Sequence, residues 1–138
     1  MHFDCEAFFH FNDSIYLFTK SREEHNFGKT NLYKIPAVKG NYEAQFIASF
    51  KTCDELPCWI TSVDISNNGK QIELLTLYAV LLLSDYTKDN FFNGKAIQIS
   101  FEHESQKEGV CFKNDSTLYI TDERSHGKGR NLYELKIE

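Results

Sequence analysis

The stretch that decides the fold is EAFFHFNDSIYLFTK, from Glu6 to Lys20, because the chain repeats its pattern near the other end. The second copy is EGVCFKNDSTLYITDE, from Glu108 to Glu123. Both stretches begin with Glu, reach Asn-Asp-Ser six residues later, and continue into a run of aromatic and β-branched residues. Such recurrence indicates a chain built from repeated structural units.

Two further observations extend this repeat along the chain. NLYKI at 31–35 returns as NLYEL at 131–135, in the same order relative to the first motif. Between the copies, WITSVDISNNGKQIELLTL at 59–77 again predicts a strand, a turn with Asn-Gly, and a second strand. Each unit therefore begins with strand, turn and strand, and the period is about 50 residues.

The remaining segments of each unit also have the composition of strands, and helical patterns are almost absent. We count four strands in the first unit, four in the second and three in the third. A period of 40 to 50 residues with four strands per unit is typical of β-propeller blades. The sequence therefore predicts an all-β fold: a partial β-propeller of about three four-stranded antiparallel blades, the last one incomplete. The predicted single domain spans 1–138, with blades at about 3–50, 58–102 and 106–138.

The predicted arc is too short to close into a ring, because propellers have four to eight blades. An open arc exposes strand edges and apolar blade faces, which favour association. Two alternatives follow. Either the chain is the C-terminal half of a larger propeller completed by its own N-terminal half, or a second copy completes the ring.

Composition and charge narrow the classes of partner. The formal net charge is −5, which argues against nucleic acid and anionic lipid, since both attract basic surfaces. The longest apolar run, YAVLLL at 78–83, is too short for membrane insertion. The N-terminal segment lacks the pattern of a signal peptide, and taken literally this predicts a cytoplasmic protein.

The four cysteines stand at positions 5, 53, 58 and 111. The spacing of Cys53 and Cys58 is that of neither a redox pair nor a usual zinc site. We expect all four to be reduced, with Cys5 and Cys111 buried as small hydrophobic residues. The alternative is a disulfide between Cys53 and Cys58, which requires an oxidising compartment.

Three acids stand out on the predicted innermost strands: Glu6, Asp64 and Glu108. In a propeller these strands line the central channel, where a ring of carboxylates would bind Ca²⁺ or another hard cation. The alternative is a structural role, in which each acid accepts backbone N–H bonds or pairs with Lys or Arg. Recurrence of the acid at equivalent positions favours the structural role.

A second polar cluster follows the second strand of the first and third units. Its members are Lys20, Arg22, Asp122, Glu123 and Arg124. These residues either line a rim that binds a polar ligand or form a solvated face with ordinary ion pairs.

The motif string also resembles a known group of proteins. FDCEAFFHFNDSIYLFTK, NLYKIP, ITSVDISNNGKQIELLTL, QKEGVCFKNDSTLYITDE and NLYEL together resemble the C-terminal half of uncharacterised, mostly secreted β-propeller proteins of Bacteroidetes-type bacteria. The resemblance covers essentially the whole chain, and it implies an exported protein, periplasmic or at the cell surface. More remotely, the chain is similar to six-bladed propellers of the gluconolactonase and calcium-dependent phosphotriesterase group, which implies a cation in the central channel.

No catalytic set is apparent, since the histidines have neither metal nor triad spacing and no phosphate loop or nucleophile elbow occurs. We therefore expect a non-enzymatic module that binds a ligand or a protein, with no catalytic residue. The alternative is a metal-dependent hydrolase of the lactonase or phosphotriesterase type. In that case Glu6, Asp64 and Glu108 would hold the cation.

Overall fold

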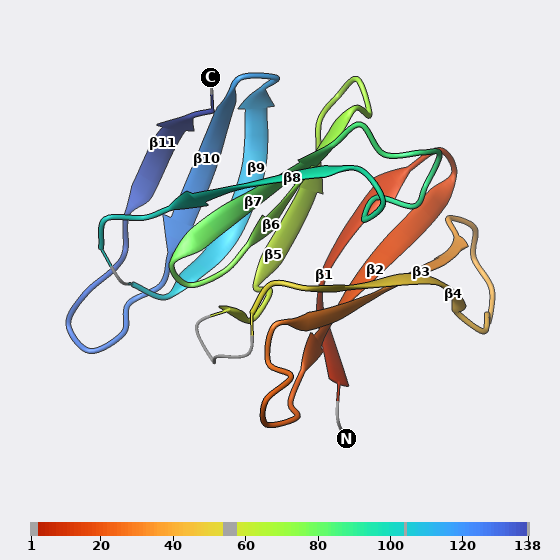
Figure 1. The fold of residues 1–138 in the computed structure, drawn as a ribbon, viewed down its shortest axis with the longest axis horizontal. Helices are drawn as coiled ribbons and strands as arrows, with labels where there is room; N and C mark the ends of the chain where they lie inside the picture. The colour runs from red at the N-terminus through yellow and green to blue at the C-terminus, as the bar shows by residue number, and fades with distance from the viewer. Residues whose placement is uncertain (1–2, 54–57, 104, 138) are drawn as a thin grey trace.

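A computed structural model describes residues 3–53, 58–103 and 105–137 (Figure 1). The fold is all-β, with eleven strands in three antiparallel sheets of four, four and three strands. This confirms the strand count predicted for each unit. Within the described ranges there is no α-helix, and accordingly no helix there is long and apolar enough to cross a membrane.

Each sheet is formed by strands that are consecutive in the chain. The first sheet has the order β1 (Phe3–Phe11), β2 (Ser14–Ser21), β3 (Lys29–Pro36) and β4 (Gln45–Lys51). The second has the order β5 (Ser62–Ile65), β6 (Gln71–Leu75), β7 (Ala79–Ser84) and β8 (Lys95–Ser100). The third comprises β9 (Lys107–Asn114), β10 (Thr117–Asp122) and β11 (Leu132–Lys136). The first strand of the middle sheet, β5, contacts both β1 and β9.

The repeated Asn-Asp-Ser motif forms two different turns. In the first sheet, Asn12 and Asp13 both adopt positive φ, 48° and 62°, which gives a two-residue hairpin turn. In the third sheet, the Asn114 side chain instead accepts a hydrogen bond from the Ser116 N–H at 2.9 Å. The register then shifts next to this turn, so that Lys113 has no partner on β10. The pairing of β9 with β10 therefore differs by one residue from the pairing of β1 with β2.

The first core lies between the first and second sheets. The first sheet contributes Ala7, Phe9, Tyr16, Phe18 and Leu32, and the second contributes Val63, Ile72, Leu74, Leu81 and Leu83. Phe91, from the loop between β7 and β8, is fully buried against Phe9 and Tyr16. Alternate residues of each strand point to this core, as the pleat requires.

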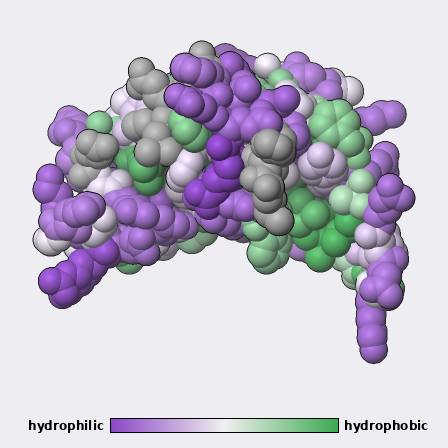
Figure 2. Space-filling view, turned by 90° about the horizontal axis from the view of Figure 1, so that it is seen from below, coloured by the Kyte–Doolittle hydropathy of each residue, from purple (hydrophilic) through white to green (hydrophobic). Residues whose placement is uncertain are grey.

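The second core lies between the second and third sheets. The second sheet contributes Leu75, Val80 and Leu82, and the third contributes Leu118 and Ile120, with Val110, Phe112, Tyr133 and Leu135 packed around them. The middle sheet is thus covered on both faces, which explains the nearly continuous burial of β6 and β7. The whole molecule has a bent, arch-like outline (Figure 2).

The cysteines differ from the expectation of four reduced thiols. Cys53 and Cys58 form a disulfide, as the alternative interpretation of the sequence predicted. Cys5 and Cys111 are free but exposed, and the prediction that they are buried is wrong. Each lies on the first strand of its sheet, β1 or β9.

Candidate functional site

Paired charges lie at one end of the first sheet, where the sequence predicted Glu6 as a metal ligand and Lys20 and Arg22 as ligand-binding residues. The Lys20 Nζ lies 3.0 Å from Glu6 Oε2, and the Arg22 Nε lies 2.6 Å from Asp4 Oδ2. Both cations also lie over the ring of Trp59, 4.6 and 4.7 Å from its centroid. These charges are therefore balanced within the chain.

Asp64, the second predicted metal ligand, joins the second sheet to the third. Its Oδ2 accepts a hydrogen bond from the backbone N–H of Phe112 at 2.9 Å. Ser62, two residues earlier, accepts one from the Val110 N–H at 3.3 Å. These bonds satisfy two N–H groups of β9 that face away from β10, which is a structural contribution of the acid.

Glu108, the third predicted ligand, lies among other charges. Burial raises the pKa of the Glu108 carboxyl, and the negative charges of Glu123 and Glu6 raise it further, while Lys20 opposes them. The structure thus brings Glu6 and Glu108 into one electrostatic neighbourhood. In the described part of the chain, however, no group of three or more His, Cys, Asp or Glu side chains could hold a metal ion.

Asp122, predicted as a ligand-binding residue, is instead the buried centre of a hydrogen-bond network. It accepts bonds from the Ser105 hydroxyl at 2.7 Å, the Tyr133 hydroxyl at 2.7 Å and the Asn131 N–H at 2.8 Å. Burial alone would raise the pKa of Asp122, but these donors outweigh it and lower the pKa to about 2. The carboxylate therefore fixes the start of the loop that follows β10.

Lys107 completes this network, although nothing in the sequence pattern indicated this role. Its side chain is buried, its Nζ donates to the Ser105 hydroxyl, and it lies 4.9 Å from the Phe101 ring centroid. Burial lowers the pKa of Lys107, and the nearby Asp122 charge opposes that effect. A lysine at the first position of a strand is ordinarily solvated, so only the packing around it reveals this role.

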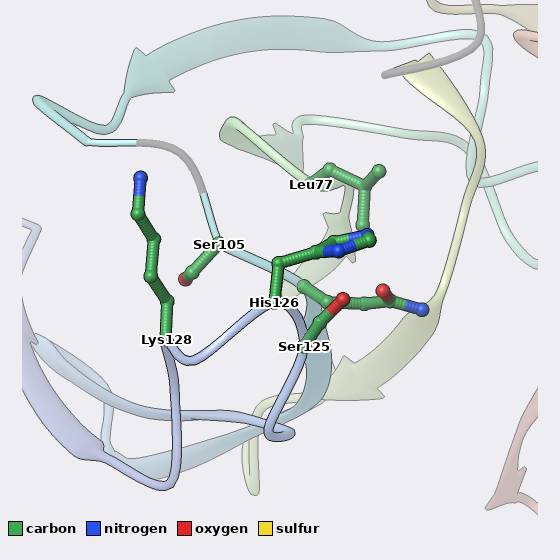
Figure 3. Close-up of a pocket in the computed structure, with 6 residues that line it drawn as sticks. Leu77, Ser105, Ser125, His126 and Lys128 are labelled. Atoms are coloured by element: carbon green, nitrogen blue, oxygen red, sulfur yellow. The ribbon is translucent and has the colours of Figure 1, made fainter.

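A cavity of about 320 Å³ opens beside this network (Figure 3). Its described lining residues are Leu77, Ser105, Gln106, Ser125, His126 and Lys128. The backbone joins the two sides of the cavity, because the Glu123 N–H donates to the Gln106 carbonyl at 3.0 Å. None of the five predicted ligand-binding residues is among the described residues that line the cavity. Asp122 contacts the lining through the hydrogen bond that it accepts from Ser105.

The loop 122–130 that borders the cavity has an unusual backbone. Ser125 and Lys128 exchange two backbone hydrogen bonds, at 2.8 and 2.9 Å, and so close a two-residue turn. Within that turn His126 has φ 50°, and further along Arg130 has φ 66°. Non-glycine residues rarely adopt positive φ, and those that do are concentrated at functional sites.

A second cavity, about 600 Å³ in volume, lies between the first and second sheets near Gly69. The Asp89 carboxylate at its wall is occupied by internal partners. It accepts hydrogen bonds from Lys34 at 2.8 Å and from the Tyr16 hydroxyl at 3.1 Å. The described residues that line the first cavity include no carboxylate, so it is the better candidate for an anionic ligand.

Known proteins give no further guide, since the chain matches no family model, no curated protein and no solved structure.

Proposed function

We propose that the chain is a non-enzymatic binding module of the β-propeller type. Its three sheets are three consecutive blades, and a second copy of the chain completes the ring. One observation carries this proposal. The uncovered face of the first sheet corresponds to the face that the third sheet packs against the second, and the uncovered face of the third sheet corresponds to the face that the first sheet packs against the second.

The outer face of the first sheet is apolar and uncovered. Phe8, Leu17, Tyr33 and Phe46 pair across β1 to β4 and form one row over the sheet. Phe8 is 64% exposed and Phe46 is 55% exposed. In the view of Figure 2, hydrophobic residues lie at the surface of the half of the molecule that carries this sheet.

The same row packs into the second core in the third sheet, where Ile120 is buried and Val110 and Tyr133 are partly buried. Val110, Ile120 and Tyr133 pair across β9, β10 and β11, and this row packs against the second sheet. Tyr133 belongs to the repeated NLY motif, in which its counterpart is Tyr33 on the uncovered face. The face that the third blade buries on its predecessor is therefore uncovered in the first blade.

The opposite relation holds at the other end of the stack. Leu32 of the repeated motif is fully buried against the second sheet, whereas its counterpart Leu132 is 65% exposed. In the third sheet Leu132 pairs with Thr121, which in turn pairs with Gly109. In the first sheet Leu32 pairs with Phe18, which in turn pairs with Ala7. The third sheet thus leaves uncovered the face that, in the first sheet, packs against the next sheet in the chain.

Two such faces form a head-to-tail pair, and a second copy presents both of them. The third sheet has three strands, so the shared face is three strands wide and about five residues long, roughly 14 by 17 Å or about 240 Å². One contact would bury about 480 Å² over both partners, which is small for a specific interface. Closing the ring makes the contact twice and buries about 1,000 Å², close to the smallest area of a specific interface.

The test is the solution mass of the chain, measured by light scattering, with variants at both ends. We expect about twice the 16.1 kDa chain mass for the unmodified protein. Phe46→Ser and Leu132→Lys should each give a folded species of one chain mass. Val38→Ser is the matched control, because Val38 is equally exposed, at 68%, but lies outside the strands. A single-chain mass for the unmodified protein would overturn self-assembly. A dimer that persists in both variants would overturn this interface.

The disulfide supports export, as the family resemblance implies, because disulfides persist in oxidising compartments. The metal-dependent hydrolase stays a prediction. Glu6 is paired with Lys20 and Asp64 with a backbone N–H, so neither is held ready for a cation.

A further inference from the structure

The loop 122–130 concentrates positive charge in an acidic chain. Arg124, Lys128 and Arg130 are exposed, and none of them forms an ion pair with a residue that the structure describes. The cations of the first sheet differ, because Lys20 is paired with Glu6 and Arg22 with Asp4.

The two acids of the loop do not cancel this charge at the cavity. The Asp122 carboxylate is buried, and the nearby Lys107 ammonium offsets its charge. Glu123 is exposed, so it is one negative charge against the three exposed cations of the loop. None of the described residues that line the cavity is acidic. The described lining residues thus contribute the cation Lys128 and no carboxylate.

The cavity also has the size and lining of a small-molecule site. Its volume of about 320 Å³ is at the lower end of the range for ligand pockets, which suits a molecule of about one sugar ring. Leu77 gives one apolar wall, and Ser125 and Gln106 provide hydrogen-bonding groups. In Figure 3 the His126 ring and the Lys128 side chain stand on opposite sides of Ser105.

The loop is held in place before any ligand arrives. Its base is tied by Asp122 to the Asn131 N–H and by the Glu123 N–H to Gln106. Gly129 adopts φ 101°, and a side chain there would overlap the Glu123 carbonyl. A fixed loop loses little conformational entropy on binding, so its charges can contribute to affinity.

From these observations we propose that the cavity bordered by loop 122–130 binds a small organic anion, a phosphate or carboxylate group carried on a polar body of about one ring. Lys128 contacts the anionic group, Arg124 attracts it from the rim, and Leu77 and His126 pack against the body. The inference rests on the proposed function only in treating the chain as a binding module. It does not need the ring, because the cavity is formed within one chain.

The test is a titration followed by two-dimensional ¹H–¹⁵N NMR at constant ionic strength. The probes are glucose 6-phosphate, glucuronate, inorganic phosphate and, as the neutral control, glucose. We expect saturable shifts of the amides at 105–106 and 125–128 with glucose 6-phosphate, glucuronate or both, and this comparison distinguishes a phosphate from a carboxylate ligand. Lys128→Gln and His126→Gln should each weaken binding about tenfold. Lys39→Gln, which removes an exposed lysine far along the chain, should leave affinity unchanged.

Three outcomes would overturn the inference: no saturable shift with either organic anion, equal affinity for glucose, or equal affinity for inorganic phosphate. Loss of affinity in Lys39→Gln as large as in Lys128→Gln would also overturn it, since binding would then follow overall charge. The same titration on Phe46→Ser separates the two proposals. Saturable binding by the single-chain Phe46→Ser protein would show that the anion site does not depend on the ring, whereas a single-chain mass for the unmodified protein would overturn the ring and leave the site standing.

Discussion

Replacing Glu73 with Gln should stabilise the folded protein at neutral pH. Glu73 lies on β6 at the centre of the middle sheet and is fully buried. Neither of its carboxyl oxygens accepts a hydrogen bond from any residue that the structure describes. Burial raises the pKa of Glu73 to about 10, and the negative charge of Asp64 adds to the increase. The side chain is therefore protonated in the folded protein at pH 7.

The magnitude follows from the difference between the folded and unfolded chains. In the unfolded chain Glu73 titrates near its ordinary value of 4.5, so at pH 7 folding requires it to take up a proton. Each pH unit above that value costs about 1.4 kcal/mol, which makes about 3 kcal/mol at pH 7. Because the folded pKa is raised, this loss of stability is absent below about pH 4.5 and grows until the pH reaches about 10. Gln has nearly the same shape and cannot ionise.

The assay is urea unfolding, followed by circular dichroism, at a series of pH values from 5 to 9. We expect Glu73→Gln to exceed the unmodified protein by about 3 kcal/mol at pH 7 and by little near pH 5. Glu43→Gln, at an exposed position, is the control and should change neither stability nor its pH dependence. If Glu73→Gln is neutral or destabilising at pH 7 and leaves the pH slope unchanged, Glu73 is charged in the folded protein and our account of its burial is wrong.

Two further changes test the network and the loop beside the cavity. Asp122→Asn should lower the free energy of unfolding by about 1–3 kcal/mol at pH 7, because buried donors lose a charged acceptor. Since the pKa of Asp122 is lowered to about 2, its contribution is present above about pH 4 and is lost toward pH 2, and urea unfolding of both forms at low pH should show their stabilities converging. Gly129→Ala should destabilise the protein strongly in thermal unfolding, because the new Cβ would overlap a backbone carbonyl. Gly127→Ala, also at positive φ but with open space around it, should cost only about 1 kcal/mol, and equal costs at the two sites would contradict the geometry.

The candidate site was only partly predictable from the sequence. Asp122, Glu123 and Arg124 drew attention because polar residues at a strand end recur in two units, but none of them is among the described residues that line the cavity. Lys107 gave no such signal, because a lysine in a polar stretch before a strand is ordinarily exposed. Its burial depends on Phe101 and on the Asp122 network, which come from other segments of the chain.

The sequence alone determined the local structure: eleven strands, their grouping into three units, and the polar loops between them. These features depend on residues close together in the chain, such as Asn-Asp-Ser turns and alternating apolar positions. A repeated sequence pattern therefore produces repeated strands. Only the tertiary structure decided which face of each sheet meets a neighbour. A one-residue difference in register moves every side chain of a strand to the other face, and the bulge at Lys113 makes that difference between two copies of one motif. It also decided that Glu73 is buried without a hydrogen-bond partner among the described residues. In the same way Phe8 is exposed while its counterpart Val110 packs against the second core, because burial depends on what another part of the chain places there.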